Sequence, residues 1–221
     1  MRRELIGWLA KVVRSIRRNH PLRVGIDGVD ASGKTRLADE LANELKKQNR
    51  QVIRASVDGF HNSKELRYQK GRDSAEGYYV DSFDNNAIIG NLLAPLGSNG
   101  NLKYKAAIFD FRTDSKINSK EETAEKTAIL VMDGVFLFRP ELINYWDLKI
   151  FLNVDFDVAV QRAAKRDGYY LGTEQKVHDK HKVRYIPGQK IYFKDAKPRE
   201  KADVVIDNND FLKPRIVKTK F

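Results

Sequence analysis

Short apolar runs alternate with amphipathic segments along most of the chain. Aliphatic and β-branched residues dominate these runs, which predict strands at 22–27, 51–57, 104–111, 128–132, 148–154 and 202–206. Leucines at positions i, i+4 and i+8 predict a helix over 35–48, and helices are also expected at 84–93 and 157–166. Strands that alternate with helices indicate an α/β fold whose sheet is parallel and carries helices on both faces.

The first 20 residues predict an amphipathic helix that ends before Pro21. Its apolar face runs from Leu5 to Ile16, and its opposite face is rich in arginine. We expect this helix (1–20) to pack its apolar face on the core of a single domain that spans 21–221. A membrane-surface helix or a transit peptide is the alternative interpretation. No apolar stretch approaches the roughly 18 residues of a membrane span, so no span is expected.

The composition of the chain excludes several kinds of site and favours one kind of partner. Its 221 residues include no cysteine, which excludes disulfides, thiolate metal sites and a cysteine nucleophile, and fits a cytoplasmic location. The formal net charge of +11 favours an anionic partner, such as a nucleic acid or a phosphorylated small molecule. Residues 162–201 hold twelve Lys and Arg against five Asp and Glu, so most of the excess lies in one segment near the C-terminus.

The most specific motif is the stretch 28–35, which fits G-x-x-x-x-G-K-[ST] and lies between a predicted strand and a predicted helix. Glycines let the backbone wrap closely around phosphate oxygens, and the helix N-terminus offers N–H donors to negative charge. We expect Lys34 to reach the terminal phosphates and Thr35 to ligate magnesium. The candidate nucleotide-binding residues of this loop are Gly28, Asp30, Ala31, Ser32, Gly33, Lys34 and Thr35.

Two further carboxylates follow predicted strands. Asp133 ends the apolar run 128–132, where a second magnesium ligand is expected beside a phosphate loop. Asp58 ends the strand predicted at 51–57. Because ligands of parallel sheets bind at the carboxyl ends of the strands, both acids are expected at the edge that carries the phosphate loop. A base at the position of Asp58 is suited to orient an attacking hydroxyl or accept its proton.

In this combination the chain resembles the uridine kinase and phosphoribulokinase group of P-loop kinases, over roughly residues 20–215. The resemblance implies a P-loop NTPase fold with a five-stranded parallel core and a mobile helical lid, placed at about 162–200. It also implies an alcohol phosphotransferase that uses ATP and Mg²⁺, with the 5′-hydroxyl of uridine or cytidine as the usual acceptor. The residues that carry it are 28–35, Asp58-Gly59-Phe60, Asp81-Ser82-Phe83-Asp84, Phe109-Asp110-Phe111-Arg112, Asp133-Gly134 and the segment from Arg162 onward.

The resemblance assigns roles to individual residues. The acid after the second strand is the catalytic base in such kinases, and it maps to Asp58. Arg162 and Arg166 share one helix face by their i,i+4 spacing and join Lys34 as catalytic cations, with Arg162 also a nucleotide contact. Most acceptor contacts are expected between the second and third strands. The candidate substrate-binding residues are Asp58, Phe60, His61, Arg67, Tyr78, Tyr79, Asp81 and Arg112.

The chain also departs from the usual pattern. It has Asp133 where uridine kinases carry a glutamate, lacks their tyrosine after the second-strand acid, and lacks their pyrimidine-contacting histidine near the third strand. Pantothenate, nicotinamide riboside or another nucleoside-like alcohol therefore remains open as the acceptor, and so does a homo-oligomer. A nucleic-acid-binding ATPase is the competing hypothesis, although no nucleic-acid module is recognisable. We interpret His178 and His181 as solvated lid residues and not as metal ligands.

Overall fold

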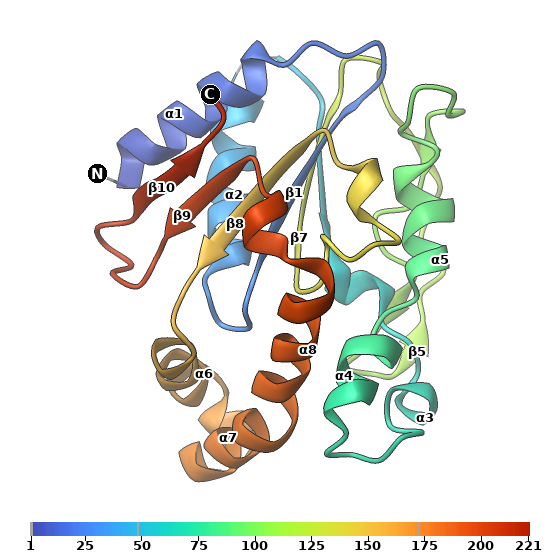
Figure 1. The fold of residues 1–221 in the computed structure, drawn as a ribbon. Helices are drawn as coiled ribbons and strands as arrows, with labels where there is room; N and C mark the ends of the chain where they lie inside the picture. The colour runs from blue at the N-terminus through green and yellow to red at the C-terminus, as the bar shows by residue number, and fades with distance from the viewer. Residues whose placement is uncertain (1, 48, 172) are drawn as a thin grey trace.

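The computed structural model describes residues 2–47, 49–171 and 173–221; Met1, Gln48 and Gly172, which fall within predicted segments, lie outside the described residues. The main sheet has six strands in the order β10-β9-β8-β1-β7-β2 (Figure 1). The strands from β9 to β2 run parallel, and β10 pairs antiparallel with β9. The strands are β1 (Leu22–Gly28), β2 (Val52–Ser56), β7 (Ile129–Gly134), β8 (Leu148–Asn153), β9 (Val204–Asp207) and β10 (Arg215–Thr219).

The α/β prediction is therefore confirmed, but the expected five-stranded sheet has a sixth, antiparallel strand at one edge. Most residues of β10 are exposed, among them Ile216 and Val217. An edge strand that contributes little to the core needs no continuous apolar run, so the hydrophobic pattern did not reveal it.

The strand predicted at 104–111 was wrong. Its ends belong to two separate two-stranded ladders outside the main sheet, β3 with β6 and β4 with β5. Tyr104 and Phe109 are buried, but residues 105–108 between them are only half-buried. This stretch is therefore not a central strand of the main sheet. The four short strands are β3 (Lys103–Tyr104), β4 (Phe109–Asp110), β5 (Ser115–Lys116) and β6 (Glu122–Thr123).

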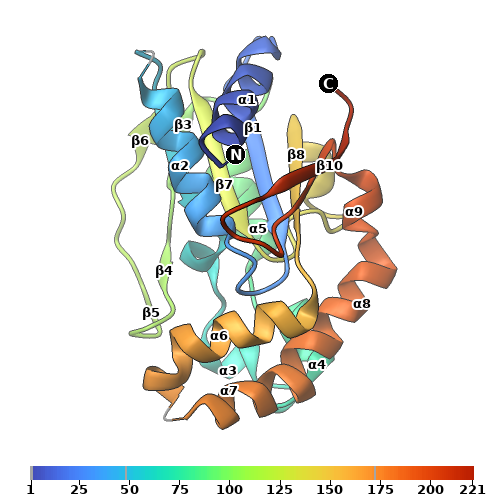
Figure 2. The ribbon, with the colours of Figure 1, turned by 90° about the vertical axis from the view of Figure 1, so that its left-hand side faces the viewer.

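The central strands are buried on both faces because each face is covered by its own set of helices. Along β7, Ile129 and Val131 join the core beneath α1 (Arg2–Ser15) and α2 (Lys34–Lys46), as Figure 2 shows. Leu130 and Met132 alternate with them and enter the core on the opposite face. That second core includes the buried residues of α5 (Asn85–Ile88) and of η2 (Ile89–Leu93), a π-helix. Because successive side chains of a strand point to opposite faces of the sheet, the single apolar run of β7 contributes to both cores.

A second group of helices gathers below the carboxyl ends of the parallel strands (Figures 1 and 2). None of the described helices is long and apolar enough to cross a membrane. On one side of the β1 end lie the 3₁₀ helix η1 (Val57–Phe60), α3 (Lys64–Arg67) and α4 (Ala75–Asp81). The other side holds α6 (Phe156–Leu171), α7 (Glu174–Lys180), the π-helix η4 (His181–Tyr185) and α8 (Ile186–Ala196). The 3₁₀ helix η3 (Ile143–Tyr145) and α9 (Pro198–Lys201) lie next to β8 and β9 in the chain.

Candidate active site

The phosphate-loop motif forms the turn between β1 and α2. A side chain at Gly28 is excluded, because a Cβ there would lie 2.6 Å from the Leu152 carbonyl oxygen. Ala31 (φ 55°) and Gly33 (φ 93°) adopt left-handed backbone conformations. Left-handed residues inside such a loop shape a concave nest of N–H groups that binds anions. Among the described residues no side chain caps α2 at Gly33, so the first N–H groups of this helix remain available to a ligand.

Lys34 lies at the centre of the loop. Its ammonium group donates a hydrogen bond to the Val29 carbonyl (2.6 Å) and lies 3.5 Å from the Ser32 hydroxyl. Burial lowers the pKa of Lys34, and surrounding carboxylates oppose this effect. Those carboxylates are Asp30, Asp133, Asp27 and Asp58. The buried Lys34 ammonium therefore stands among four acids at one edge of the sheet.

Thr35 and Asp133, the two expected magnesium ligands, lie in contact with each other. The Thr35 hydroxyl donates to Asp133 Oδ2 at 2.7 Å. The other carboxylate oxygen, Oδ1, lies 2.6 Å from Arg54 Nη2, and Arg54 Nε in turn donates to Asp39 at 2.8 Å. Asp133 is buried with only 3% of its side chain exposed. Sequence reasoning missed Arg54, because an arginine on an edge strand carries no motif of its own.

Asp58 belongs to the same edge because β2 runs parallel to β7, with Ser56 opposite Asp133. It sits in η1, where its backbone N–H donates to the Ser56 hydroxyl. Loss of solvation around its carboxyl group raises the pKa of Asp58 to about 6, and the like charge of Asp133 adds to the rise. More than half of the side chain is still exposed, so a ligand can reach it.

Asp27 and Asp30 complete the acidic group. Asp27 is fully buried, which raises its pKa to about 6, and its carboxylate accepts hydrogen bonds from the N–H groups of Gly28 and Phe138. Asp30 lies at the surface of the loop, where positive charges around it outweigh desolvation and lower its pKa. Sequence reasoning did not single out Asp27, although a carboxylate inside a fully buried strand was the available signal.

Several predicted acceptor contacts pack mainly against protein. His61 stacks between Phe83 and Phe111, with ring centroids 4.5 and 4.9 Å away, and burial lowers its pKa to about 4. Phe60 is fully buried in the core. The Tyr79 hydroxyl donates to Asp195 at 2.6 Å. The structure thus directs the polar groups of Tyr79 and His61 to protein partners.

The remaining acceptor candidates differ in their burial and in their partners. Tyr78 packs its ring 4.7 Å from Tyr185, and burial raises its pKa, with the charges of Asp30 and Asp58 adding to the rise. Arg67 is buried and pairs with Asp114 at 2.8 Å. Asp81 is half-buried, and its backbone carbonyl accepts from Asn62 Nδ2. Arg112 is exposed and lies 5.8 Å from the Phe111 ring.

The two lid arginines diverge. Arg166 approaches the phosphate loop, with its Nη2 3.6 Å from Asp30 Oδ1, and its positive charge also acts on Asp58. Arg162 turns instead to the end of β9, where its Nη2 donates to the carbonyls of Asn208 and Asn209 at 2.9 Å each. The expectation of a solvated His181 was wrong, since this side chain is 2% exposed and lies 3.5 Å from the Asp30 carboxylate. The Tyr185 ring packs against it, with the two ring centroids 5.0 Å apart.

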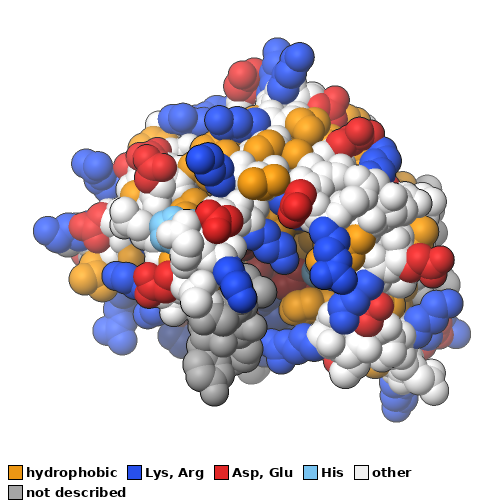
Figure 3. Space-filling view, turned by 90° about the horizontal axis from the view of Figure 1, so that it is seen from below, with side chains coloured by type: hydrophobic (Ala, Val, Ile, Leu, Met, Phe, Trp, Pro, Cys, Tyr) orange, Lys and Arg blue, Asp and Glu red, His pale blue; other side chains and the backbone are white. Residues whose placement is uncertain are grey.

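Seen along this edge, the surface is hollowed near its centre and bordered by Lys and Arg side chains (Figure 3). Groups of three or more His, Cys, Asp or Glu that could hold a metal ion are absent from the described residues. A divalent cation at this site would therefore take its remaining ligands from a bound phosphate or from water, which is the usual arrangement for magnesium.

The chain is similar to known proteins in sequence and in fold. The model of the cytidylate kinase-like family matches residues 23–210. A uridine kinase from Leuconostoc citreum is 28% identical over 149 residues, which span 66% of this chain and 69% of that enzyme. A uridine kinase from Ligilactobacillus salivarius is 23% identical over 86% of both chains. The solved structure of a possible uridine kinase from Bacillus stearothermophilus has the same fold, with a TM-score of 0.73 at 24% identity and coverage of 92% of this chain and 97% of that one.

Proposed function

The chain belongs to the cytidylate kinase-like family, and from this premise we propose that it transfers the γ-phosphoryl group of ATP to a hydroxyl of a nucleoside, with uridine and cytidine as the first candidates. Its relatives and its fold make it a P-loop kinase. In this proposal residues 21–221 form one kinase domain whose lid covers about 162–200. The N-terminal helix is a packed addition to that domain, since its buried face continues the core beneath α2.

The phosphate loop binds the triphosphate in this proposal. The nest between Val29 and Gly33 and the uncapped start of α2 offer N–H groups to the phosphate oxygens. The Lys34 ammonium is placed to reach the terminal phosphates when it leaves the Val29 carbonyl. Arg166 borders the same loop and supplies a second positive charge.

The donor set of the site fits Mg²⁺. A threonine hydroxyl and a carboxylate are hard oxygen ligands, and Thr35 and Asp133 already lie in hydrogen-bond contact. When bound, the cation would offset the negative charge of the phosphates. Arg54 holds the Asp133 carboxylate in place from the opposite side.

Asp58 is the base in this proposal. Above its pKa of about 6 the carboxylate can orient an acceptor hydroxyl and take its proton as the phosphoryl group is transferred. Lys34 and Arg166 act on the charge of the transferred group, while the lid excludes water from the reaction. The single observation that best supports the proposal is that Asp58 and Asp133 lie beside the phosphate loop at one edge of the sheet.

The acceptor has two candidate classes. The curated relatives are named uridine kinases, which favours the 5′-hydroxyl of uridine or cytidine. The matched family is described as cytidylate kinase-like, which favours a phosphate oxygen of a nucleoside monophosphate such as CMP. The exposed Asp58 serves as a base only for the hydroxyl acceptor, because a monophosphate oxygen is already ionised at neutral pH.

The test is ADP release from Mg·ATP in the presence of uridine, cytidine, CMP, nicotinamide riboside or pantothenate. We expect uridine or cytidine to stimulate release, and Asp58→Asn to abolish that stimulation while ATP still binds. Asp157→Asn, an exposed acid on α6, is the matched control and keeps full activity. Full activity of Asp58→Asn removes Asp58 from the mechanism. ADP release stimulated only by DNA or RNA replaces the small-molecule proposal with the nucleic-acid-dependent ATPase.

A further inference from the structure

One face of the continuous helix formed by η4 and α8 touches both halves of the candidate site. Figure 1 shows α8 running between the lid helices α6 and α7 on one side and α4 on the other. We call residues 64–81, which include α3 and α4, the acceptor segment. The helix residues in contact recur every three or four positions and form one stripe: His181, Arg184, Tyr185, Gly188, Gln189 and Tyr192.

Gln189 makes the contact with the phosphate loop. Its side chain is buried, and its Oε1 accepts a hydrogen bond from the backbone N–H of Asp30 at 2.8 Å. Its Nε2 donates to the Tyr185 carbonyl one helical turn earlier, which fixes the orientation of the amide. One turn further along, the Tyr192 hydroxyl donates to the Asp27 carboxylate at the end of β1. The start and the middle of the loop are therefore both tied to this helix.

Arg184 makes the contact with the acceptor segment. Its guanidinium is almost fully buried and donates to four backbone carbonyls of that segment. Nη1 contacts the carbonyls of Gly71 (3.3 Å), Arg72 (3.0 Å) and Ser74 (2.9 Å), and Nη2 contacts that of Arg67 (3.1 Å). A planar group with five N–H donors is suited to hold several carbonyls at once, which a lysine cannot reproduce.

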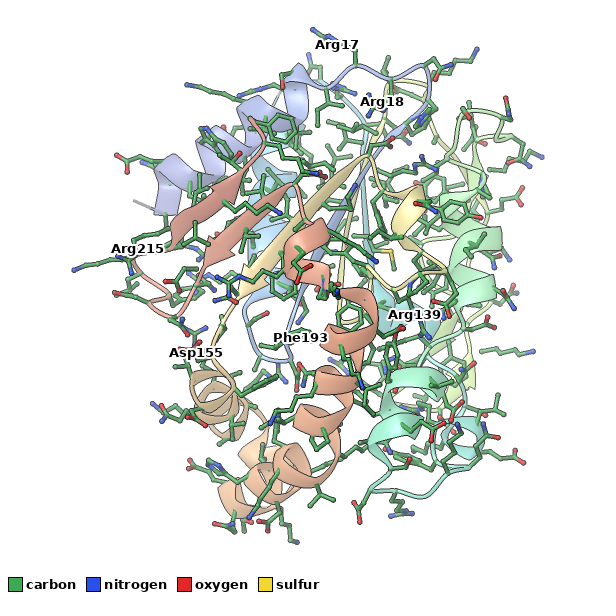
Figure 4. The ribbon with its side chains drawn as sticks, in the orientation of Figure 1. Arg17, Arg18, Arg139, Asp155, Phe193 and Arg215 are labelled. Atoms are coloured by element: carbon green, nitrogen blue, oxygen red, sulfur yellow. The ribbon has the colours of Figure 1, made fainter. Side chains whose placement is uncertain are left out.

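Close packing reinforces these bonds. A Cβ at Gly188 would lie 2.7 Å from the Ala75 carbonyl oxygen and 2.8 Å from the Tyr78 ring, so α8 and α4 approach at a distance that only glycine permits. On another side of α8, Phe193 (Figure 4) packs 5.9 Å from the Phe156 ring and 6.0 Å from the Phe151 ring. These ring contacts anchor α8 to β8 and α6, in addition to its contacts with the two halves of the site.

We propose that Arg184 and Gln189 are positioning residues that couple the phosphate loop to the acceptor segment, so that nucleotide binding orders the segment that receives the acceptor. A nucleotide stabilises the loop conformation in which the Asp30 N–H meets Gln189. Because η4 and α8 form one helix, ordering of Gln189 also orders Arg184, whose guanidinium binds carbonyls between residues 67 and 74. Because such coupling is reciprocal, a bound acceptor tightens nucleotide binding by the same factor. The assignment of 64–81 to the acceptor rests on the proposed function.

Hydrogen exchange measured by mass spectrometry tests the coupling in the full chain, with and without Mg²⁺ and a non-hydrolysable ATP analogue. In the wild type we expect the nucleotide to slow exchange in residues 64–81 by about 5-fold or more. Gln189→Leu removes the acceptor of the Asp30 N–H, and Arg184→Met removes the contacts to the segment. Both variants are expected to keep nucleotide protection of the phosphate loop and to lose that of 64–81. Lys190→Ala, an exposed position on α8, retains both effects.

The outcomes separate this inference from the proposed function. Protection of the phosphate loop without any change in 64–81 of the wild type overturns the coupling and leaves the kinase proposal standing. Absence of nucleotide protection at the phosphate loop overturns both. Retained protection of 64–81 in Gln189→Leu and Arg184→Met also overturns the coupling. Gln189→Leu leaves the Arg184 guanidinium and its carbonyl partners in place, so it still tests the coupling where Arg184→Met does not fold.

Discussion

Phosphoryl transfer by this protein is expected to become faster as the pH rises from 5 to 7. The reason is the position of Asp58, whose pKa is raised to about 6 by loss of solvation and by the charge of Asp133. A base works only in its ionised form. Protonation of Asp58 below pH 6 therefore removes the base and slows transfer, and ionisation above pH 6 restores it.

The size of the effect follows from the same pKa. A carboxyl group with a pKa of about 6 is about 9% ionised at pH 5 and about 91% ionised at pH 7, which predicts a roughly tenfold rise in kcat/KM. An aspartate at the ordinary value of 3.8 would already be about 94% ionised at pH 5 and would give an almost flat profile. The two cases differ by far more than the scatter of an initial-rate measurement.

The assay is the initial rate of product formation, followed by chromatography between pH 5 and pH 8, with Mg·ATP and the acceptor identified by the panel. Asp27 also has a pKa of about 6, so the two carboxylates must be distinguished. Arg166→Met removes a positive charge that lowers the pKa of Asp58, and moves the midpoint upward if Asp58 controls the rate. Tyr192→Phe removes a hydrogen bond that lowers the pKa of Asp27, and moves the midpoint upward only if Asp27 controls it.

Two results would refute the reasoning. A profile that is flat between pH 5 and pH 7 means that no group with a pKa near 6 must ionise for transfer. A midpoint that follows Tyr192→Phe and ignores Arg166→Met assigns the titration to Asp27, and the base at Asp58 is then lost from the mechanism.

Three further predictions concern the loop and the core. Lys34→Ala is expected to lower kcat/KM by at least about 100-fold, measured as ADP release, because it removes the central cation of the phosphate loop. Leu9→Ala on α1, where the side chain is fully buried, is expected to lower the free energy of unfolding by about 2–5 kcal/mol in urea, whereas the exposed Lys11→Ala stays within about 0.5 kcal/mol. Gly188→Ala forces α8 away from Tyr78 and is expected to lower the free energy of unfolding by about 1–3 kcal/mol in the same titration.

The parts of the fold that the sequence predicted are those with a local physical signature. The apolar run of β7 is continuous from Ile129 to Met132, and burial of a strand on both faces favours such a run whatever its neighbours are. The phosphate loop is also local, since its glycines and Lys34 lie within eight residues. The contact between Thr35 and Asp133 joins residues 98 positions apart, yet it was predictable because parallel strands place their carboxyl ends at one edge.

Errors arose where burial depends on a distant partner. Tyr104 and Phe109 are as apolar as strand residues, but neither is buried by neighbouring strands of the main sheet. Tyr104 packs in the second core, and Phe109 belongs to the separate ladder of β4 and β5. His181 looks like a solvated histidine in a polar stretch, because nothing local indicates that Asp30, 151 positions earlier, lies against it. Asp27 likewise acquires its raised pKa from complete burial within the folded domain.

The stripe on η4 and α8 explains why the acceptor half of the site was the harder half to predict. Its residues differ in chemistry and include a guanidinium, an amide, a phenol and a glycine, so they form no motif. What they share is a contact with one of two segments that are more than 100 residues away in the chain. Arg184, a cation of the basic lid, donates its hydrogen bonds to backbone carbonyls of the acceptor segment. Positive charge in the lid therefore has two separate uses: Arg184 binds backbone carbonyls, and Arg166 borders the phosphate loop.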